Sequence, residues 1–365
     1  MRRNLSAYVS EFAGTAIMLF IGVSAVAFMW SPGSPVPVVE NGALRRLLTG
    51  LMFAGGATAV VYSPLGQISG GHINPAVTLA FWRLGKVSTR DAVIYAVVQC
   101  LGAIAGAFAA GVAWGPLTTG VQYAATVPGQ GYTVAGALVA ETAITFLLVF
   151  TIFICVNKPR FAPRTGLIAG TLVAFLVMVE APVTGTSLNP ARTLGPALLA
   201  PNYTALWVYF VGPAAGALLA AAAYRGQWGG QTVCAKLYHT EKYPCPFEAC
   251  NYRLVSAGET VMNEGEPGSE AYVVERGRLD VRRAGLAADV PLAQLGPGDW
   301  VGEMSVLLDE PRSATVIART DAQLRRVSKH DMGHVLAEDP SRTEELLRQL
   351  ARRVKATNER LSGSV

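Results

Sequence analysis

Two short stretches of this sequence share an unusual chemistry, an asparagine followed by proline and alanine. They are residues 69–76, which contain Asn74, and residues 185–192, which contain Asn189. Each Asn is suited to cap a helix, and each Pro falls at the first helical position, where a missing N–H costs nothing. The helices that follow are predicted to last two or three turns, half of a bilayer core of roughly 30 Å. Their N-terminal dipoles and side-chain amides could contact a polar solute inside a membrane.

Two further groups of residues could do chemistry, and both lie after residue 225. The first group could form a tetrahedral zinc shell of three thiolates and an imidazole: Cys234, His239, Cys245 and Cys250. Its spacing differs from the usual zinc knuckle, so reduced cysteines without a metal remain the alternative. The second group lies in residues 302–316, where Gly302 and Glu303 precede Arg312. A glycine for close approach, a carboxylate and a guanidinium together could bind a hydroxylated anion.

The composition changes sharply near Arg225, and the change predicts a membrane domain followed by a soluble one. The first 225 residues carry 17 charged side chains, whereas the last 140 carry 38. The mean hydropathy of the whole chain is +0.35. Six apolar segments are long enough to span a bilayer, roughly 7–30, 44–66, 91–113, 133–156, 165–183 and 204–225. The first of them contains Glu11 and is long enough to span, so it is predicted to be a helix and not a cleaved signal peptide.

Basic residues in alternate connectors orient these segments. Clusters of Arg and Lys precede the first span, follow the first half-helix, separate the fourth and fifth spans, and follow the sixth. Such connectors favour the cytoplasm, which places both termini inside. The two Asn-Pro-Ala starts then enter from opposite sides and can meet at the midplane. A Thr-Gly-Leu triplet at Thr49 and again at Thr165 precedes each start by a similar distance. The halves are therefore predicted to form an inverted repeat, with a site where they meet.

These residues resemble the aquaporin (major intrinsic protein) family over about residues 5–225. The resemblance depends on the two boxes, on His72 before the first, on Arg192 after the second, and on carboxylates in the first and fourth spans. It implies a passive channel that passes neutral solutes and rejects protons, one pore per subunit, and a homotetramer. In such a pore the dipoles of opposed half-helices and the amides of the two box asparagines interrupt a proton wire.

The resemblance also implies a four-residue filter near the outer mouth. Counting from the boxes gives Ala54, Val177, Thr186 and Arg192. The spacing leaves Phe53 as an alternative to Ala54, and that ring would narrow the pore. Water-selective relatives resemble one another in a Phe and a His that this filter lacks. A wide Ala/Val/Thr/Arg filter favours larger uncharged solutes alongside water, including undissociated metalloid acids or polyols.

Four ionisable residues of the membrane half need partners or a pore-lining position. Glu11 and Glu141 are expected to accept hydrogen bonds from the loops before the half-helices, since isolated charge is costly in a membrane. Glu180 is either another partner for loop backbone or a contact of the outer vestibule. His72 is expected to line the cytoplasmic vestibule, as a hydrogen-bonding residue or as a pH gate.

The last part of the chain is predicted to be a small β-roll followed by helices. Alternating strands are expected at 260–262, 271–274, 279–281, 314–318 and 324–327, and helices at 331–337 and 341–361. Residues 302–316 resemble the phosphate-binding cassette of cyclic-nucleotide-binding domains. The resemblance implies that Gly302 allows close approach, Glu303 accepts the ribose 2′-hydroxyl, Arg312 binds the cyclic phosphate, and Ser313 contacts phosphate or base. Serine at this last position leaves cyclic AMP and cyclic GMP both open.

The sequence therefore predicts a channel domain over 1–225, a Cys/His-containing linker over 226–252 and a nucleotide-binding domain over 253–365. The expected function is passive permeation of water and small uncharged solutes, regulated by a cyclic nucleotide, in a cell (inner) membrane. The alternatives are a wide-filter channel with a ligand-free tail and a membrane-anchored nucleotide receptor. The sequence contains no recognisable pair of nucleophile and base that would indicate an enzyme. It also contains no basic patch with interleaved aromatic residues that would indicate nucleic-acid binding.

Overall fold

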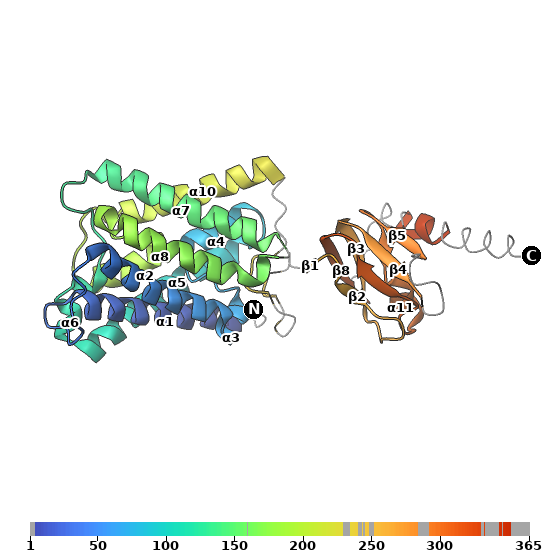
Figure 1. The fold of residues 1–365 in the computed structure, drawn as a ribbon, viewed down its shortest axis with the longest axis horizontal. Coiled ribbons are helices and arrows are strands. Elements are labelled where there is room, and N and C mark those ends of the chain that lie inside the picture. The colour runs from blue at the N-terminus through green and yellow to red at the C-terminus, as the bar shows by residue number, and fades with distance from the viewer. Residues whose placement is uncertain are drawn as a thin grey trace, which may run out of the picture. The chain divides into compact units, whose positions relative to one another are not determined.

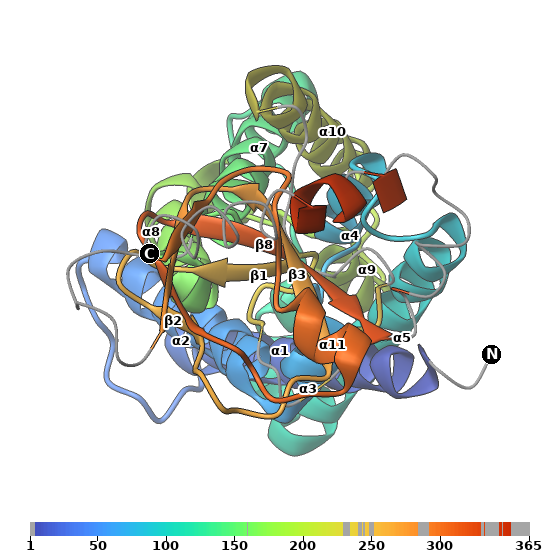
Figure 2. The ribbon, with the colours of Figure 1, turned by 90° about the vertical axis from the view of Figure 1, so that its right-hand side faces the viewer.

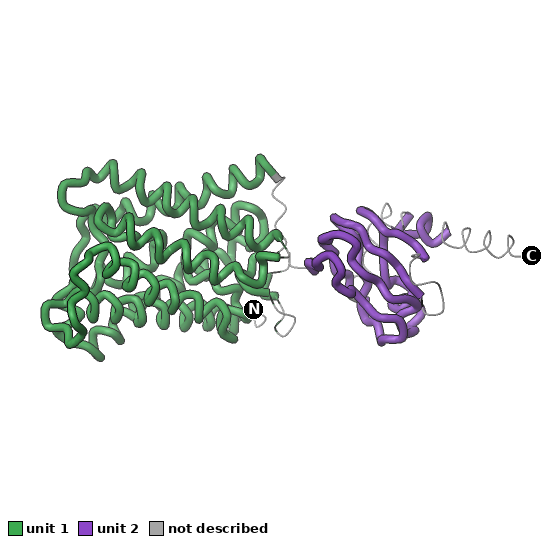
Figure 3. The backbone as a smooth tube through the Cα atoms, viewed as in Figure 1, with its two compact units in different colours: residues 1–250 green, residues 251–365 purple. Residues whose placement is uncertain are grey.

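The computed structural model describes residues 4–158, 160–228, 234–239, 243, 245–247, 252–283, 292–329, 332, 343–344 and 346–351. The chain divides into two compact units, residues 1–250 and residues 251–365 (Figure 3). The segment 226–252, expected as a separate linker, belongs mostly to the first unit.

The first unit is built from helices (Figure 1). Its elements are α1 (Leu5–Trp30), α2 (Gly42–Tyr62), α3 (Pro64–Ser69), α4 (Pro75–Arg83), α5 (Thr89–Trp114), α6 (Pro116–Thr119), α7 (Val134–Val156), α8 (Thr165–Thr184), α9 (Pro190–Leu199) and α10 (Val208–Trp228), with 3-10 turns η2 (Gln122–Ala124) and η3 (Ala162–Arg164). Among the described residues, six helices are long and apolar enough to cross a membrane: α1, α2, α5, α7, α8 with the preceding η3, and α10. The predicted spans are confirmed.

Glycines let the long helices pack closely in pairs. Helix α1 packs against α5, and α7 packs against α10. A Cβ at Gly106 of α5 would lie 2.1 Å from the carbonyl oxygen of Ala16, and one at Gly216 of α10 would lie 2.3 Å from that of Thr142. Small residues at such crossings are typical of helix packing in membranes. The same device in corresponding pairs is consistent with two related halves.

The two half-helices begin where the sequence predicts. Helix α4 is capped by Asn74, whose side chain accepts a hydrogen bond from the backbone N–H of Ala76. Helix α9 is capped by Asn189, which accepts from the N–H groups of Ala191 and Arg192. Both helices begin with proline, and α4 contains 9 residues and α9 contains 10. Neither is long enough to cross a bilayer, so their N-termini end inside the first unit.

The second unit contains two four-stranded antiparallel sheets (Figure 2). One has the order β1-β8-β3-β6 and the other β2-β7-β4-β5. The strands are β1 (Tyr252–Val255), β2 (Thr260–Met262), β3 (Glu270–Arg276), β4 (Leu279–Arg282), β5 (Ala293–Leu295), β6 (Trp300–Val301), β7 (Thr315–Ala318) and β8 (Ala322–Ser328), with the short helix α11 (Glu303–Leu308) after β6. The predicted β-roll is confirmed. Strands β1, β5 and β6 were not among the predicted ones, and β6 has two residues, too few to show alternation.

The structure describes part of the two helices predicted at the C-terminal end of the chain. Residues 343–344 and 346–351 are helical, and Leu346 is buried against the sheet residues Val273 and Val327. Gln349 fixes this helix to β6 through its side chain, which accepts from the N–H of Trp300 at 2.8 Å and donates to its carbonyl at 2.9 Å. Of the helix expected at 331–337, Met332 is described, as helical. The remaining residues of both predicted helices lie outside the described residues.

Candidate functional site

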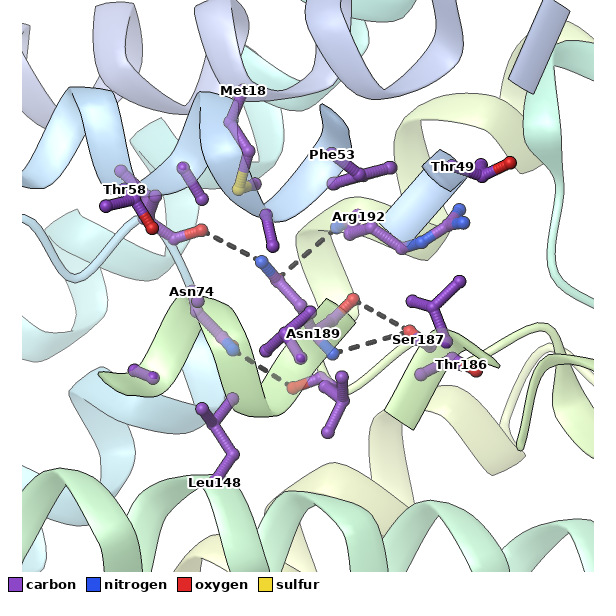
Figure 4. A pocket seen from close by; sticks show the side chains of 18 of the residues that line it. Met18, Thr49, Phe53, Thr58, Asn74, Leu148, Thr186, Ser187, Asn189 and Arg192 are labelled. Atoms are coloured by element: carbon purple, nitrogen blue, oxygen red, sulfur yellow. Dashed lines mark hydrogen bonds between the residues drawn. The ribbon is translucent and has the colours of Figure 1, made fainter. Parts of the chain in front are cut away.

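The two Asn-Pro-Ala boxes meet through a reciprocal pair of hydrogen bonds (Figure 4). The Nδ2 atom of Asn74 donates to the carbonyl of Leu188 at 3.0 Å, and the Nδ2 atom of Asn189 donates to the carbonyl of Ile73 at 2.9 Å. Each amide has two hydrogens, so one bond to the opposite box leaves a second donor on each asparagine. Both asparagines line the same cavity. The arrangement therefore presents two donors of opposed half-helices to one path.

Buried carboxylates hold the loops before the boxes in a conformation that is costly for the chain. Ile73 has φ 43° and Leu188 has φ 57°, in the left-handed region that branched side chains rarely adopt. Glu11 accepts hydrogen bonds from the backbone N–H of His72 at 3.0 Å and of Ile73 at 2.7 Å.

Glu141 does the same in the other half, since it accepts from the N–H of Ser187 at 2.8 Å and of Leu188 at 2.9 Å. Both carboxylates are fully buried. The structural role expected for Glu11 and Glu141 is confirmed by these bonds.

A cavity of about 470 Å³ runs past the boxes and is bounded by residues of both halves. The four residues expected at the filter all line it: Ala54, Val177, Thr186 and Arg192. Phe53 lines it as well, so both candidates for the first position contact the path. The Phe53 ring packs so tightly on α1 that a Cβ at Gly22 would lie 2.2 Å from it. Most of the lining is apolar, and the polar groups include the box amides, His72 and Arg192.

Arg192 is positioned by one carbonyl and one ring. It is 8% exposed, and its Nη1 atom donates to the carbonyl of Ala124 at 2.7 Å. The Cζ atom lies 5.1 Å from the centroid of Phe53 (Figure 4). A guanidinium has five donors, so further N–H groups remain for a passing oxygen. A fixed positive charge at this point also opposes the entry of cations.

His72 does line the cavity, but the structure buries it more deeply than an open vestibule would. It is 1% exposed. Its Nε2 atom lies 2.7 Å from the carbonyl oxygen of Ala235, and its Nδ1 atom lies 3.0 Å from the hydroxyl of Thr78. A carbonyl can only accept, so Nε2 carries the hydrogen in this pair. No pattern in the sequence indicates that a residue beyond the sixth span contacts the loop before the first box.

The zinc hypothesis finds little support in the described part of the chain. The Sγ atom of Cys234 lies 3.4 Å from the Nδ1 atom of His239. No group of three or more potential ligands is found among the residues that the structure describes, Cys245 included. Cys250 lies outside the described residues. The described residues therefore supply no group of three ligands for the expected four-ligand shell.

In the second unit, the predicted cassette folds around Arg312. This side chain is 7% exposed, and its guanidinium donates to the carbonyl of Gly302 at 2.8 Å and to that of Glu270 at 2.6 Å. A Cβ at Gly302 would lie 2.3 Å from Nη1, and one at Gly268 would lie 2.5 Å from Cζ. Both glycines are thus required for the arginine to fit. Two bonds leave further guanidinium hydrogens for an anion.

The other predicted ligand residues surround the same turn. Glu303 follows Gly302 and is 1% exposed, whereas Ser313 is exposed. Gly302 has φ 76°, which reverses the chain between β6 and α11. The Glu270 backbone is held in place because its carboxylate pairs with Arg326 at 2.7 Å and accepts a hydrogen bond from the Tyr272 hydroxyl. Burial, helped by Glu270, raises the pKa of Tyr272 and keeps that hydroxyl a donor. The residues therefore fit a cyclic phosphate and its ribose.

Six spanning helices around two opposed, asparagine-capped half-helices define a membrane channel. The family model described as Major intrinsic protein matches residues 2–224, and the model described as Cyclic nucleotide-binding domain matches residues 252–339. The chain belongs to the major intrinsic protein family, whose aquaporins are passive channels and not enzymes, and carries a cyclic nucleotide-binding domain after the channel.

Curated relatives and a solved structure agree with this assignment. Mouse Aquaporin-4 is 39% identical over 218 residues, which are 59% of this chain and 65% of that protein. Aquaporin AqpM of Methanothermobacter thermautotrophicus is 39% identical over 237 residues, 60% of this chain and 95% of the relative. The aquaglyceroporin structure from Plasmodium falciparum has a TM-score of 0.52 at 21% identity, covering 60% and 95% of the two chains. That last similarity shows a shared fold.

Proposed function

We propose that this protein is a passive channel for water and small uncharged solutes, regulated by a cyclic nucleotide that binds its C-terminal domain. The observation that carries the channel part is the reciprocal contact of Asn74 and Asn189 in one cavity. It supports proton exclusion, because opposed dipoles and oriented donors make a continuous proton wire unfavourable there. Charge in the connectors supports cytoplasmic termini in a cell (inner) membrane, and family membership supports a homotetramer.

The filter residues favour a solute larger than water. Ala54, Val177 and Thr186 contribute small or apolar groups to the lining, and Arg192 supplies the charged donors. Such a filter suits neutral, hydroxyl-rich molecules, including polyols and undissociated metalloid acids. Phe53 limits the width, since its ring lies under the Arg192 guanidinium.

The regulatory part of the proposal depends on Arg312. Its guanidinium is already bound by two carbonyls in a turn that excludes any side chain at Gly268 and Gly302. A cyclic phosphate could accept the remaining hydrogens, while the Glu303 carboxylate could accept a ribose hydroxyl. Cyclic AMP and cyclic GMP both satisfy this chemistry, and Ser313 is the residue proposed to discriminate between them.

Stopped-flow permeation in proteoliposomes tests both parts. Water, glycerol, urea and boric acid would be presented with and without cyclic AMP or cyclic GMP inside. Permeation above that of empty liposomes, changed by one nucleotide, is the expected result. A protein that permeates nothing in the panel would contradict the channel, and equal rates with and without nucleotide would contradict the regulation.

Asn189→Asp should lower permeation of every solute at least about tenfold. The new carboxylate cannot donate to the Ile73 carbonyl, and two acceptors facing each other in a buried site repel. Asn202→Asp is the matched control, because that half-buried side chain bonds to Gln122, at 2.7 Å, away from the boxes. Swelling rates of Asn189→Asp equal to those of Asn202→Asp would refute the role of the boxes.

A further inference from the structure

The strongest unassigned feature of the first unit is the segment that follows α10. We call the described residues 234–239, 243 and 245–247 the plug segment. Four consecutive residues of it, Cys234 to Leu237, are buried, although they belong to a connection rather than to a helix. Connections usually lie on the surface. Their burial means that something in the first unit accommodates them.

The plug segment is bound to the loop before the first box by backbone bonds. The N–H of Leu237 donates to the carbonyl of Gly70 at 2.9 Å, and the carbonyl of Ala235 accepts from His72 at 2.7 Å. Gly70 has φ 104°, and a Cβ there would lie 3.1 Å from the ring of Phe247. The loop is therefore shaped to receive this segment. Lys236 is 1% exposed, and its ammonium donates to the carbonyls of Gln67 and Tyr243.

An aromatic stack completes the contact. The His72 ring is stacked with the rings of Phe81 and Phe247. The ring centroids are 5.1 Å and 5.4 Å apart, and the ring planes are inclined by 11° and 15°, respectively. Phe247 also lies 5.7 Å from the ring of Tyr95 and is 4% exposed. Burial of a phenylalanine is worth roughly tenfold or more in an equilibrium between bound and released states. Phe247 is thus the largest apolar anchor among the described residues of the segment.

Leu237 places the segment at the path itself, because it lines the same cavity as His72 and the two box asparagines. From the charge pattern, this end of the path is the cytoplasmic one. We propose that the plug segment closes the inner mouth of the channel, and that nucleotide binding releases it. The proposal rests on the regulated channel argued above and gives its regulation a direction, from closed to open.

The covalent connection between Phe247 and the nucleotide-binding domain provides a route by which nucleotide binding can release the plug segment. Phe247 precedes the first strand of the nucleotide-binding domain, which begins at Tyr252, by five residues. Five residues span at most about 18 Å, so a rearrangement of the domain is passed to Phe247 with little slack. The closed state is held by hydrogen bonds and by burial of Ala235, Leu237 and Phe247, so a ligand must have enough differential affinity for the released state to offset these contacts.

Replacing Phe247 tests the closure. Without nucleotide, Phe247→Ala should permeate water roughly tenfold faster than the wild type, and nucleotide should add little. The matched control is Phe161→Ala, which removes a half-buried ring from a different connector of the same unit. Because nucleotide binding and release are coupled, Phe247→Ala should bind nucleotide more tightly than the wild type in calorimetry, whereas Phe161→Ala should bind it equally. Equal permeation by Phe247→Ala and Phe161→Ala would overturn the plug.

Hydrogen–deuterium exchange on the unmodified full chain gives a second readout that does not depend on a variant folding. The amide of Leu237 should be protected without nucleotide and exchange faster with it, since its bond to Gly70 breaks on release. Unchanged protection would overturn nucleotide-driven release. If nucleotide alters wild-type permeation while protection stays constant, the plug fails and the regulated channel stands. If exchange rises but nothing permeates, release stands and the channel proposal fails.

A second, independent observation concerns the Glu180 carboxyl of α8. The hydroxyl of Thr184 lies 2.6 Å from Oε1 of Glu141 and also 2.6 Å from Oε1 of Glu180. A hydroxyl has one hydrogen, so it cannot donate to both carboxylates. One carboxyl must carry a proton. Glu141 accepts two backbone N–H groups, which stabilise its ionised form. We infer that Glu180 is protonated and donates to Thr184.

This proton makes Glu180 a positioning residue for the filter. Its Oε2 atom accepts the hydroxyl of Thr186 at 2.6 Å. Thr186 lines the cavity, whereas Glu180 is not one of the residues that do. The Thr186 hydroxyl is therefore turned from the path, and the filter stays apolar at this point. The protonated carboxyl thus orients the Thr186 side chain without placing another negative charge beside the buried Glu141.

The neutral state of Glu180 predicts an unusual pair of variants. Glu180→Gln should keep the wild-type ratio of glycerol to water permeation, because an amide can donate to Thr184 and accept from Thr186. Glu180→Leu should free the Thr186 hydroxyl and lower that ratio roughly threefold. If the glycerol-to-water ratio changes in both Glu180→Gln and Glu180→Leu, Glu180 is not protonated. If the ratio changes in neither variant, Glu180 does not position the filter.

Two controls accompany these variants. Glu40→Gln, at an exposed carboxylate, should leave the ratio unchanged. The infrared carbonyl stretch of a protonated carboxyl should be present in the wild type and absent in Glu180→Gln. Its persistence in Glu180→Gln would contradict the assignment even if Glu180→Leu does not fold.

Discussion

Arg312→Ala should abolish measurable binding of cyclic nucleotide to the full-length protein, with an affinity loss of roughly a hundredfold or more. A charge-assisted hydrogen bond contributes about 1.5–3 kcal/mol, and a guanidinium on a phosphate makes at least two. The same change removes donors from the carbonyls of Gly302 and Glu270, which hold the turn. Calorimetry with cyclic AMP and cyclic GMP measures the loss, and the nucleotide response of permeation should vanish with it.

Two controls separate binding from folding in this experiment. Arg319→Ala removes an exposed arginine from the same domain and should bind as the wild type does. Arg312→Lys keeps the charge but cannot reach two carbonyls and a phosphate with one ammonium, so it should bind with intermediate affinity. Wild-type affinity in Arg312→Ala would show that the cassette does not hold the ligand.

The second large effect is expected at Glu141. Glu141→Ala leaves the buried N–H groups of Ser187 and Leu188 without their acceptor, at about 1–3 kcal/mol each. It also leaves Leu188 at φ 57° without the bonds that hold it. We expect a loss of roughly 2–6 kcal/mol in the free energy of unfolding, with loss of permeation.

Thermal unfolding in detergent or nanodiscs measures this effect. Glu40→Ala is the matched control, since it removes an exposed carboxylate of a loop and should leave the midpoint within error. An unchanged midpoint in Glu141→Ala would mean that another group, or water, satisfies the two N–H groups. The corresponding Glu11→Ala change should act in the same direction, because Glu11 accepts from His72 and Ile73 in the other half.

Much of the channel follows from the sequence because its constraints are local. A bilayer requires long apolar helices, so the six spans are legible from composition alone. Asn and Pro at a helix start are a capping signal, so both half-helices could be placed within a residue. Counting spans gave the inverted repeat, and a lone carboxylate in a span implied a backbone partner. In the second unit, Gly302 and Arg312 were recognisable as parts of one turn.

The tertiary structure decided what depends on residues distant in the chain. The packing of α7 against α8 brings the Thr184 hydroxyl to both Glu141 and Glu180. The proton inferred on Glu180 could therefore not be predicted from either helix alone. The four cysteine and histidine positions looked like a zinc shell, but the described ones form no group of three potential ligands, and Cys234 is instead buried in the connection after α10.

The two boxes also combine local features, which the sequence determines, with contacts between distant residues, which only the fold decides. Their sequence determines opposed half-helices with amide donors, because capping and helix length are local properties. Whether the path between them is open depends on Phe247 and Ala235, which reach His72 from more than 160 residues away. No periodicity or spacing encodes that contact, since it is made by burial of a few side chains of a connection. The sequence alone determined a pore, because its signals are local, whereas the contact proposed to close it depends on the tertiary fold.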